Sequence, residues 1–332
     1  MIDKTRPMTL GDIFSTTFSI TGKTFFRNLV IAAVFLVPAG LLLGFGLQSF
    51  FSNIADFTQN AAEYDNDIKP SQIVKMLAAG ILYFFSLFIF MFCYFAALIG
   101  ITKTSAGEIE GIKISLSEAF GKIFSVTYLR ALGLILLILL AMAGIMGFFI
   151  LIVALTGAID NWIFKFFGVV TAIVTILFMI YLIFRWYFSF VNIVAAEDGI
   201  VESLKKSSFL VKDYWWRTFG IIILISLIVS FASTLISTPF SFLFMWGFIS
   251  EYMNSLASGD DPAASIKMLK SVGFGYGLTM GLSTLLQALI LPVSYVVMYY
   301  DLKIRKNDFP SAASEEGNTG EDNTRSWELP VE

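Results

Sequence analysis

The chain has 332 residues, of which 57% are hydrophobic and 14% are charged, whereas soluble domains carry roughly 25% charged residues. This composition and the mean hydropathy of +0.79 exclude an ordinary water-soluble domain. The net charge of −3 is small, so its distribution along the chain is more informative than its total.

The first predicted element is an amphipathic helix over residues 9–25, where Leu10, Ile13, Phe14 and Phe18 recur at helical spacing. Such a helix is typical of a membrane interface. A first crossing is expected at 29–51, because about 20 apolar residues span the hydrocarbon. A polar, acidic loop at 52–70 then leads to a second crossing at 73–101.

Residues 102–114 are predicted to form a loop that contains Gly107 and Gly111. The amphipathic pattern returns at 115–126. The third crossing is expected at 131–155 and the fourth at 166–195, and the short turn between them predicts an antiparallel hairpin.

The third amphipathic stretch begins near residue 198 and reaches Trp215-Trp216-Arg217. It precedes a fifth crossing at 218–248, a polar loop at 249–270 and a sixth crossing at 271–300. The tail, 307–332, is rich in Ser, Glu, Asn and Gly and is predicted to be disordered.

The three amphipathic stretches share a pattern. An acidic residue lies two positions after the apolar start of each, and an arginine precedes each odd-numbered crossing: Leu10, Asp12 and Arg27; Leu116, Glu118 and Arg130; Ile200, Glu202 and Arg217. The predicted fold is therefore an all-α membrane protein. Residues 1–306 form six transmembrane helices in three hairpins, each preceded by a cytoplasmic interfacial amphipathic helix.

Positive charge lies mostly on one side of this topology. Sixteen of the 22 Lys and Arg residues fall in the segments 1–27, 102–130, 185–217 and 301–306. Because such residues stay in the cytoplasm, both termini and the tail are predicted to be cytoplasmic.

The three arginines at the helix entrances have two interpretations. Arg27, Arg130 and Arg217 could anchor helix ends by snorkelling. Alternatively, they could form a site for anionic lipid headgroups, since the guanidinium matches phosphate. The lysines that would join this site are Lys122, Lys205, Lys206 and Lys212.

Three other polar side chains fall within predicted spans. Arg185 is placed about two turns inside the fourth crossing, where a charge is either functional or snorkelling. Gln48 and Gln287 are explained by hydrogen bonds between helices. The glycines of residues 273–277 are explained by close helix packing.

Catalytic signatures are missing from the sequence. There is no histidine, and Cys93 is the only cysteine. No phosphate-binding loop, metal-ligand spacing or serine nucleophile box is present, and no acid lies at the middle of a span. We therefore expect no enzymatic activity, cofactor or metal, and no nucleic-acid partner.

Three strings together resemble the glycerophosphoryl diester phosphodiesterase membrane-domain family: Arg6-Pro7-Met8-Thr9-Leu10-Gly11-Asp12-Ile13, Glu202-Ser203-Leu204-Lys205-Lys206-Ser207 followed by Trp215-Trp216-Arg217-Thr218-Phe219-Gly220, and Tyr299-Tyr300-Asp301-Leu302-Lys303-Ile304-Arg305-Lys306. This resemblance implies a stand-alone bacterial inner-membrane module without the catalytic domain. The chain departs from the family pattern at Ser208 and after Lys306.

Two functions are therefore expected. The first is a non-enzymatic scaffold or accessory module that contacts inner-leaflet anionic lipids, and a membrane-protein partner would suit such a module. The alternative is a transporter or lipid-translocating permease with a path between the hairpins near Arg185.

Overall fold

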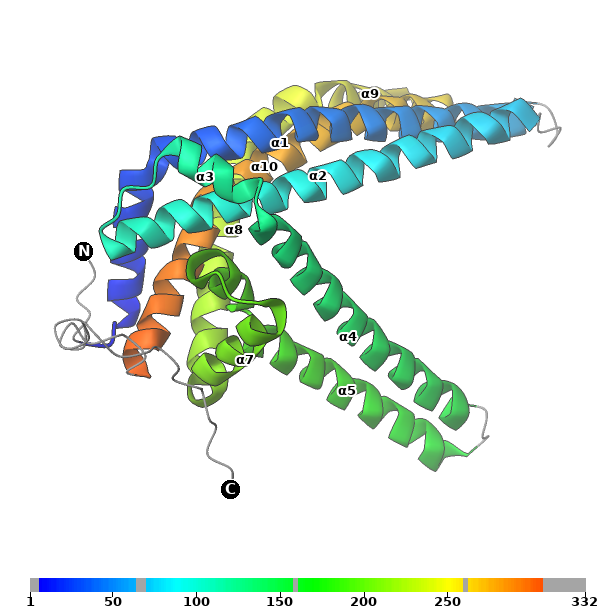
Figure 1. Ribbon diagram of the computed structural model, residues 1–332. Coiled ribbons are helices and arrows are strands. Elements are labelled where there is room, and N and C mark those ends of the chain that lie inside the picture. The colour runs from blue at the N-terminus through cyan, green and yellow to red at the C-terminus, as the bar shows by residue number, and fades with distance from the viewer. Residues whose placement is uncertain (1–5, 64–69, 158–160, 259–261, 307–332) are drawn as a thin grey trace, which may run out of the picture.

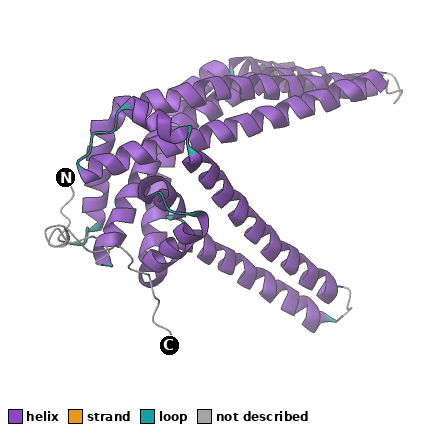
Figure 2. Cartoon of the chain, viewed as in Figure 1, coloured by secondary structure: helices purple, strands orange, loops and turns teal. Residues whose placement is uncertain are grey.

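The computed structural model describes residues 6–63, 70–157, 161–258 and 262–306; the predicted tail, 307–332, lies outside them. Helices make up 93% of the structure, and the described residues contain no strand (Figure 2). The helices are α1 Leu10–Glu63, α2 Pro70–Glu110, α3 Leu116–Ile123, α4 Val126–Gly157, α5 Trp162–Arg185, α6 Ser189–Val191, the π-helix Asn192–Ala196, α7 Ile200–Val211, the 3₁₀ turn Lys212–Tyr214, α8 Trp215–Phe244, α9 Trp246–Ser258 and α10 Pro262–Arg305.

Six helical segments are long and apolar enough to cross a membrane, which confirms the predicted multi-pass membrane protein. Each overlaps one predicted crossing. They are Leu10–Gln59, Pro70–Glu110, Val126–Thr156, Trp162–Ala196, Ile200–Phe244 and Gly273–Arg305.

The first amphipathic stretch and the first crossing are one continuous helix. α1 bends sharply after its N-terminal segment, drawn in dark blue in Figure 1. The hydroxyls of Thr17 and Thr24 donate to carbonyl oxygens four residues earlier, and such bonds are typical of bent helices. The predicted loop at 52–70 is wrong in its first half, because α1 continues to Glu63; residues 64–69 lie outside the described part.

The loop predicted at 102–114 is also mostly helix, since α2 runs to Glu110. Thr104, Ser105 and Ala106 in this part are buried, so packing stabilises a polar segment that sequence alone suggests is a loop. Gly111, which directly follows α2, has a φ of 84° in the left-handed region that glycine adopts at helix ends.

The later boundaries differ in the same way. The fourth crossing is interrupted at residues 186–188, between α5 and α6. The fifth crossing ends at Phe244, and the predicted loop at 249–270 is instead largely α9 and the start of α10. Residues 259–261 lie outside the described part.

Two groups of helices leave the same end of the molecule in different directions. α1, α2, α9 and α10 run together to a distant tip, whereas α4 and α5 run side by side at a wide angle to them (Figure 1). Residues 28–63 of α1 alone extend roughly 54 Å at about 1.5 Å per residue, which exceeds the roughly 30 Å of hydrocarbon.

α1 and α10 approach closely along glycines. A Cβ on Gly277 would lie 2.4 Å from the Cα of Gly44, and one on Gly273 would lie 2.5 Å from the Cα of Gln48. The Gln48 side chain accepts a hydrogen bond from the Phe274 backbone N–H at 3.0 Å. The glycines of 273–277 therefore serve helix packing, as predicted, and Gln48 joins two helices.

The pair formed by α4 and α5 is the least covered part of the chain. No residue is buried in the most apolar window of α4, and only 11% of that of α5 is buried. Apart from the packing of α4 against α5, this apolar surface is left largely uncovered by the described chain, so lipid is the environment that suits it.

Candidate functional site: a collar of cations and aromatic side chains

The three amphipathic stretches meet at one end of the molecule. We call residues 6–27, 104–130, 185–217 and 296–306 the collar. It contains the bent start of α1, the helices α3 and α7, and the end of α10 (Figure 1).

The recurring position of an acid near each helix start corresponds to a capping box in two of the three stretches. Thr9 and Asp12 exchange side-chain to backbone hydrogen bonds at 2.9 and 3.2 Å. Ser115 and Glu118 form the same capping box at 2.7 and 3.2 Å. The backbone N–H of Ser115 holds the pKa of Glu118 below its usual value.

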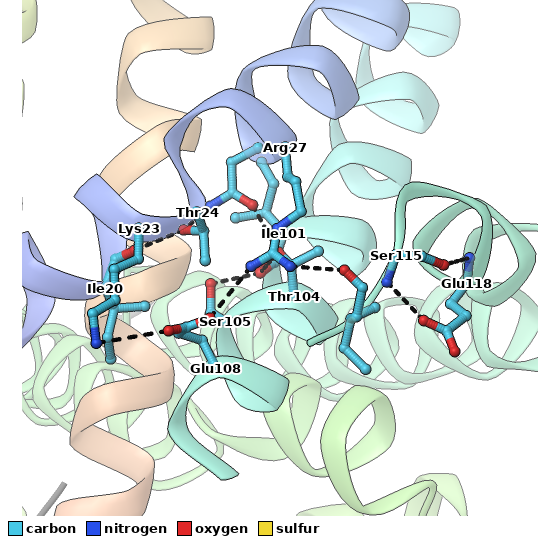
Figure 3. A network of polar contacts seen from close by, with 12 residues as sticks. Ile20, Lys23, Thr24, Arg27, Ile101, Thr104, Ser105, Glu108, Ser115 and Glu118 are labelled. Atoms are coloured by element: carbon cyan, nitrogen blue, oxygen red, sulfur yellow. Dashed lines mark hydrogen bonds and ion pairs between the residues drawn. The ribbon is translucent and has the colours of Figure 1, made fainter. Parts of the chain in front are cut away.

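Arg27 joins α1 to the junction between α2 and α3. Its Nη1 donates to the carbonyl oxygen of Ile114 at 2.9 Å, and its Nη2 lies 3.5 Å from a Glu108 carboxylate oxygen. Figure 3 shows this arginine between α2 and the Ser115 cap. Lys23 adds a longer ion pair to Glu108 at 3.7 Å.

Arg130 makes the corresponding contact between α4 and the residues that precede α7. Its Nη1 donates to the carbonyl oxygen of Glu197 at 2.8 Å. The Glu197 carboxylate pairs with Lys122 at 2.5 Å and with Lys103 at 3.9 Å. The hydrogen bond from Lys122, aided by the charges of Lys122, Lys103 and Arg130, holds the pKa of Glu197 below its usual value.

Arg217 makes the third contact, with the N-terminal arm. Its Nη2 donates to the carbonyl oxygen of Met8 at 2.9 Å, and its Nη1 lies 2.6 Å from an oxygen of Asp301. Asp301 is fully buried. It also accepts from the Met8 backbone N–H at 2.8 Å and from Arg305 at 3.0 Å.

These contacts form a closed series. Arg27 binds the carbonyl before α3, Arg130 binds a carbonyl before α7, and Arg217 binds the carbonyl before the cap of α1. The first two contacts link one amphipathic stretch to the next one along the chain, whereas the third links the last stretch back to the first. The three arginines therefore hold the collar together through charge-assisted hydrogen bonds.

The predicted lysines divide into two groups. Lys122 and Lys206 are engaged with carboxylates, and Lys206 lies 2.8 Å from Asp198 and 3.0 Å from Glu202. Lys205 and Lys212 are exposed and make no ion pair with a described residue. Lys113, which the sequence did not single out, is exposed in the same way.

Arg185 and Gln287 lie apart from the arginine series. Arg185 is the last residue of α5, and it donates to the Tyr181 hydroxyl at 3.2 Å. Its carbonyl oxygen accepts from Ser207 of α7 at 2.9 Å, which places it at the collar end of the helix. Gln287 donates to Ser283 in its own helix at 3.3 Å.

Each of the three amphipathic stretches also has one large aromatic side chain that is more exposed than its other aromatic side chains. Phe26 is 79% exposed, Phe124 is 79% exposed and Trp216 is 78% exposed. Phe26 and Trp216 directly precede their arginines. Aromatic side chains in such positions are typical of the boundary between lipid and water.

Several polar residues that sequence reasoning missed also fasten the collar. Thr104 donates to Asn28 at 2.7 Å, and both side chains are fully buried between α1 and α2. The Tyr300 hydroxyl donates to Glu110, which ties α10 to the end of α2. The signal that could have found Glu108, Glu110 and Asp301 is the rarity of acids next to the apolar runs. No group of His, Cys, Asp or Glu among the described residues is arranged to hold a metal ion.

A family described as a domain of unknown function, DUF7847, matches residues 12–302. Comparison with curated proteins and with solved structures gives no match. The resemblance to the glycerophosphoryl diester phosphodiesterase membrane-domain family is wrong, because this match is to a different family and none to that family was found. The strings behind it have local structural reasons: Thr9 and Asp12 cap a helix, and Arg217 pairs with Asp301.

Proposed function

Since the chain belongs to the DUF7847 family, whose function is unknown, we propose a function from its own geometry. The protein is a non-enzymatic scaffold or accessory module of the bacterial cytoplasmic membrane. Its collar lies at the inner leaflet and contacts anionic lipids.

The proposed architecture has three units, each with an amphipathic collar segment followed by a hairpin of two crossings. The closed series of arginine contacts supports this division, because equivalent arginines reach equivalent places before α3, α7 and α1. The excess of Lys and Arg in the collar segments supports a cytoplasmic collar and cytoplasmic termini.

One observation carries the proposal: the three most exposed aromatic side chains of the collar, Phe26, Phe124 and Trp216, lie in the same collar as the exposed lysines. Aromatic groups favour the depth at which acyl chains meet headgroups. Lysines just above that depth attract anionic lipid by about 1 kcal/mol each.

The arginines and lysines then have different roles. Arg27, Arg130 and Arg217 are occupied by carbonyl and carboxylate oxygens of the protein, so their main role is to fix the collar. Lys113, Lys205 and Lys212 present their charges to the surroundings, and they are the residues we propose to face lipid headgroups.

The proposal predicts that the protein purified from membranes carries an excess of anionic over zwitterionic phospholipid. In the double variant Lys113→Gln and Lys205→Gln, this excess should fall severalfold, because two exposed charges are removed from the collar. Lipid mass spectrometry of the purified protein measures the ratio. The arginines are unsuitable for this test because their loss would also disrupt the collar.

Lys75→Gln is the matched control, since Lys75 is an exposed lysine near the start of α2, far from the collar. It should leave the lipid ratio unchanged. A double variant with the same lipid ratio as the wild type would contradict the collar's contact with anionic lipid.

The other function expected from the sequence is transport along a path near Arg185. The position of Arg185 at the collar end of α5, bonded within its own helix and to α7, favours a structural role. We therefore propose the scaffold.

A further inference from the structure

A cavity of about 750 Å³ opens between α5, the 3₁₀ turn and the start of α8. Its lining includes Leu177 and Tyr181 from α5, Lys212 and the acidic Asp213 from the turn, and Trp216, Arg217 and Phe219 from α8. Its volume falls within the range of small-molecule sites, and it lies between two of the membrane-crossing segments.

The aromatic wall of this cavity is fixed by internal contacts. The Trp215 indole N–H donates to the Tyr181 carbonyl oxygen at 3.2 Å. The Trp215 ring stacks on Phe219 with centroids 5.1 Å apart. Trp216 meets Trp215 edge to face at 4.7 Å. The wall is therefore held in place without a ligand.

The collar end of the cavity is positively charged. Arg217 and Arg305 share Asp301, and Lys306 pairs with Asp213. Lys212 lies next to Asp213 in the chain but makes no ion pair of its own among the described residues. The charged residues that line the cavity itself are Lys212, Asp213 and Arg217. Arg217 and Asp213 each have an ion-pair partner, so Lys212 is the lining charge that an anionic group would balance.

The opposite end of the cavity is apolar. Leu177 lies about two turns before the end of α5 and is 60% exposed. Ile180 lies between it and Tyr181 along the same stretch of helix. The cavity therefore runs from a cation at the collar, past aromatic rings, to an apolar surface within the membrane-crossing part of α5.

We propose that this cavity binds one anionic phospholipid. Its phosphate lies at Lys212, its glycerol region lies against Tyr181 and Trp216, and the start of an acyl chain lies along Leu177 and Ile180. The order of cation, amphipathic aromatic group and apolar surface matches the order of groups in the lipid. This site deepens the proposed lipid contact of the collar and rests on it.

The test is native mass spectrometry of the full chain in detergent, titrated with dioleoyl phosphatidylglycerol or dioleoyl phosphatidylcholine. The wild type should retain one phosphatidylglycerol in preference to phosphatidylcholine. Lys212→Gln should weaken this retention at least about tenfold, since a charge-assisted contact is lost. Leu177→Trp, which fills the apolar end, should abolish it.

Lys75→Gln is the matched control, because Lys75 is an exposed lysine outside the collar and does not line the cavity. It should retain phosphatidylglycerol as the wild type does. The thermal midpoints of all variants should agree, because Leu177 and Lys212 are exposed side chains.

Unchanged retention in both Lys212→Gln and Leu177→Trp would overturn the site. Equal competition by glycerol 3-phosphate, which has no acyl chain, would also overturn it in favour of a phosphate site. If only the lipid ratio of the Lys113 and Lys205 double variant stays at the wild-type value, the general collar contact fails while this cavity stands. If instead the double variant loses its excess of anionic lipid while Lys212→Gln and Leu177→Trp retain phosphatidylglycerol, the cavity is ruled out and the general collar contact remains.

Discussion

Replacing Asp301 with asparagine should lower the free energy of unfolding by about 3–5 kcal/mol, the cost of removing one partner from a buried ion pair. The Asp301 carboxylate is fully buried and bonds Arg217, Arg305 and the Met8 backbone N–H. The neutral amide would leave two guanidinium groups facing each other without a counter-charge. The thermal midpoint of the detergent-purified protein, followed by tryptophan fluorescence, measures the loss.

Asp213→Asn is the matched control. Asp213 also pairs with a cation, Lys306, but its side chain is 59% exposed, and exposed pairs contribute about 0–1 kcal/mol. If both variants unfolded at the same temperature, Asp301 would not be the group that joins the ends of the described chain.

Replacing Gly277 with leucine should have the second large effect, because it would force α1 and α10 apart. Even a Cβ at this position would lie 2.4 Å from the Gly44 Cα, so the added side chain cannot fit without movement of a helix. Overpacking of a well-packed contact typically costs about 1–3 kcal/mol. The thermal midpoint and the yield of monodisperse protein should both fall.

Gly144→Leu provides the comparison in α4. Nothing lies within 4 Å of a Cβ placed on Gly144, and its surroundings are exposed apolar residues. This variant should unfold at the wild-type temperature or slightly above it. Equal midpoints for the two leucine variants would contradict close packing of α1 on α10.

The crossings could be predicted from the sequence because each depends on a local property, a run of apolar residues long enough to span the hydrocarbon. The equivalence of Arg27, Arg130 and Arg217 was also visible, since their spacing from the apolar starts is similar. Their partners were not visible. Glu108, Glu197 and Asp301 lie 81, 67 and 84 residues away along the chain, and no local pattern reports such contacts.

The predicted helix boundaries were wrong where tertiary packing outweighed the local polarity of the sequence. Residues 102–110 contain Thr, Lys, Ser and Glu and were predicted as loop, yet Thr104 and Ser105 are buried against neighbouring helices and continue α2. Their hydroxyls are satisfied within α2 and by Asn28. Buried hydrogen bonds therefore maintain the helix at this end together with the buried apolar side chains of Ala106 and Ile109.

The proposed collar of cations and aromatic side chains should lie on the cytoplasmic side of the six membrane crossings. Single cysteines placed at Lys113, Lys205, Lys75 and Lys165 in a Cys93→Ser background test it with a membrane-impermeant maleimide on spheroplasts. We predict that cysteines at 75 and 165 react in intact spheroplasts, whereas those at 113 and 205 react only after permeabilisation. Labelling of 113 and 205 in intact spheroplasts would contradict the account.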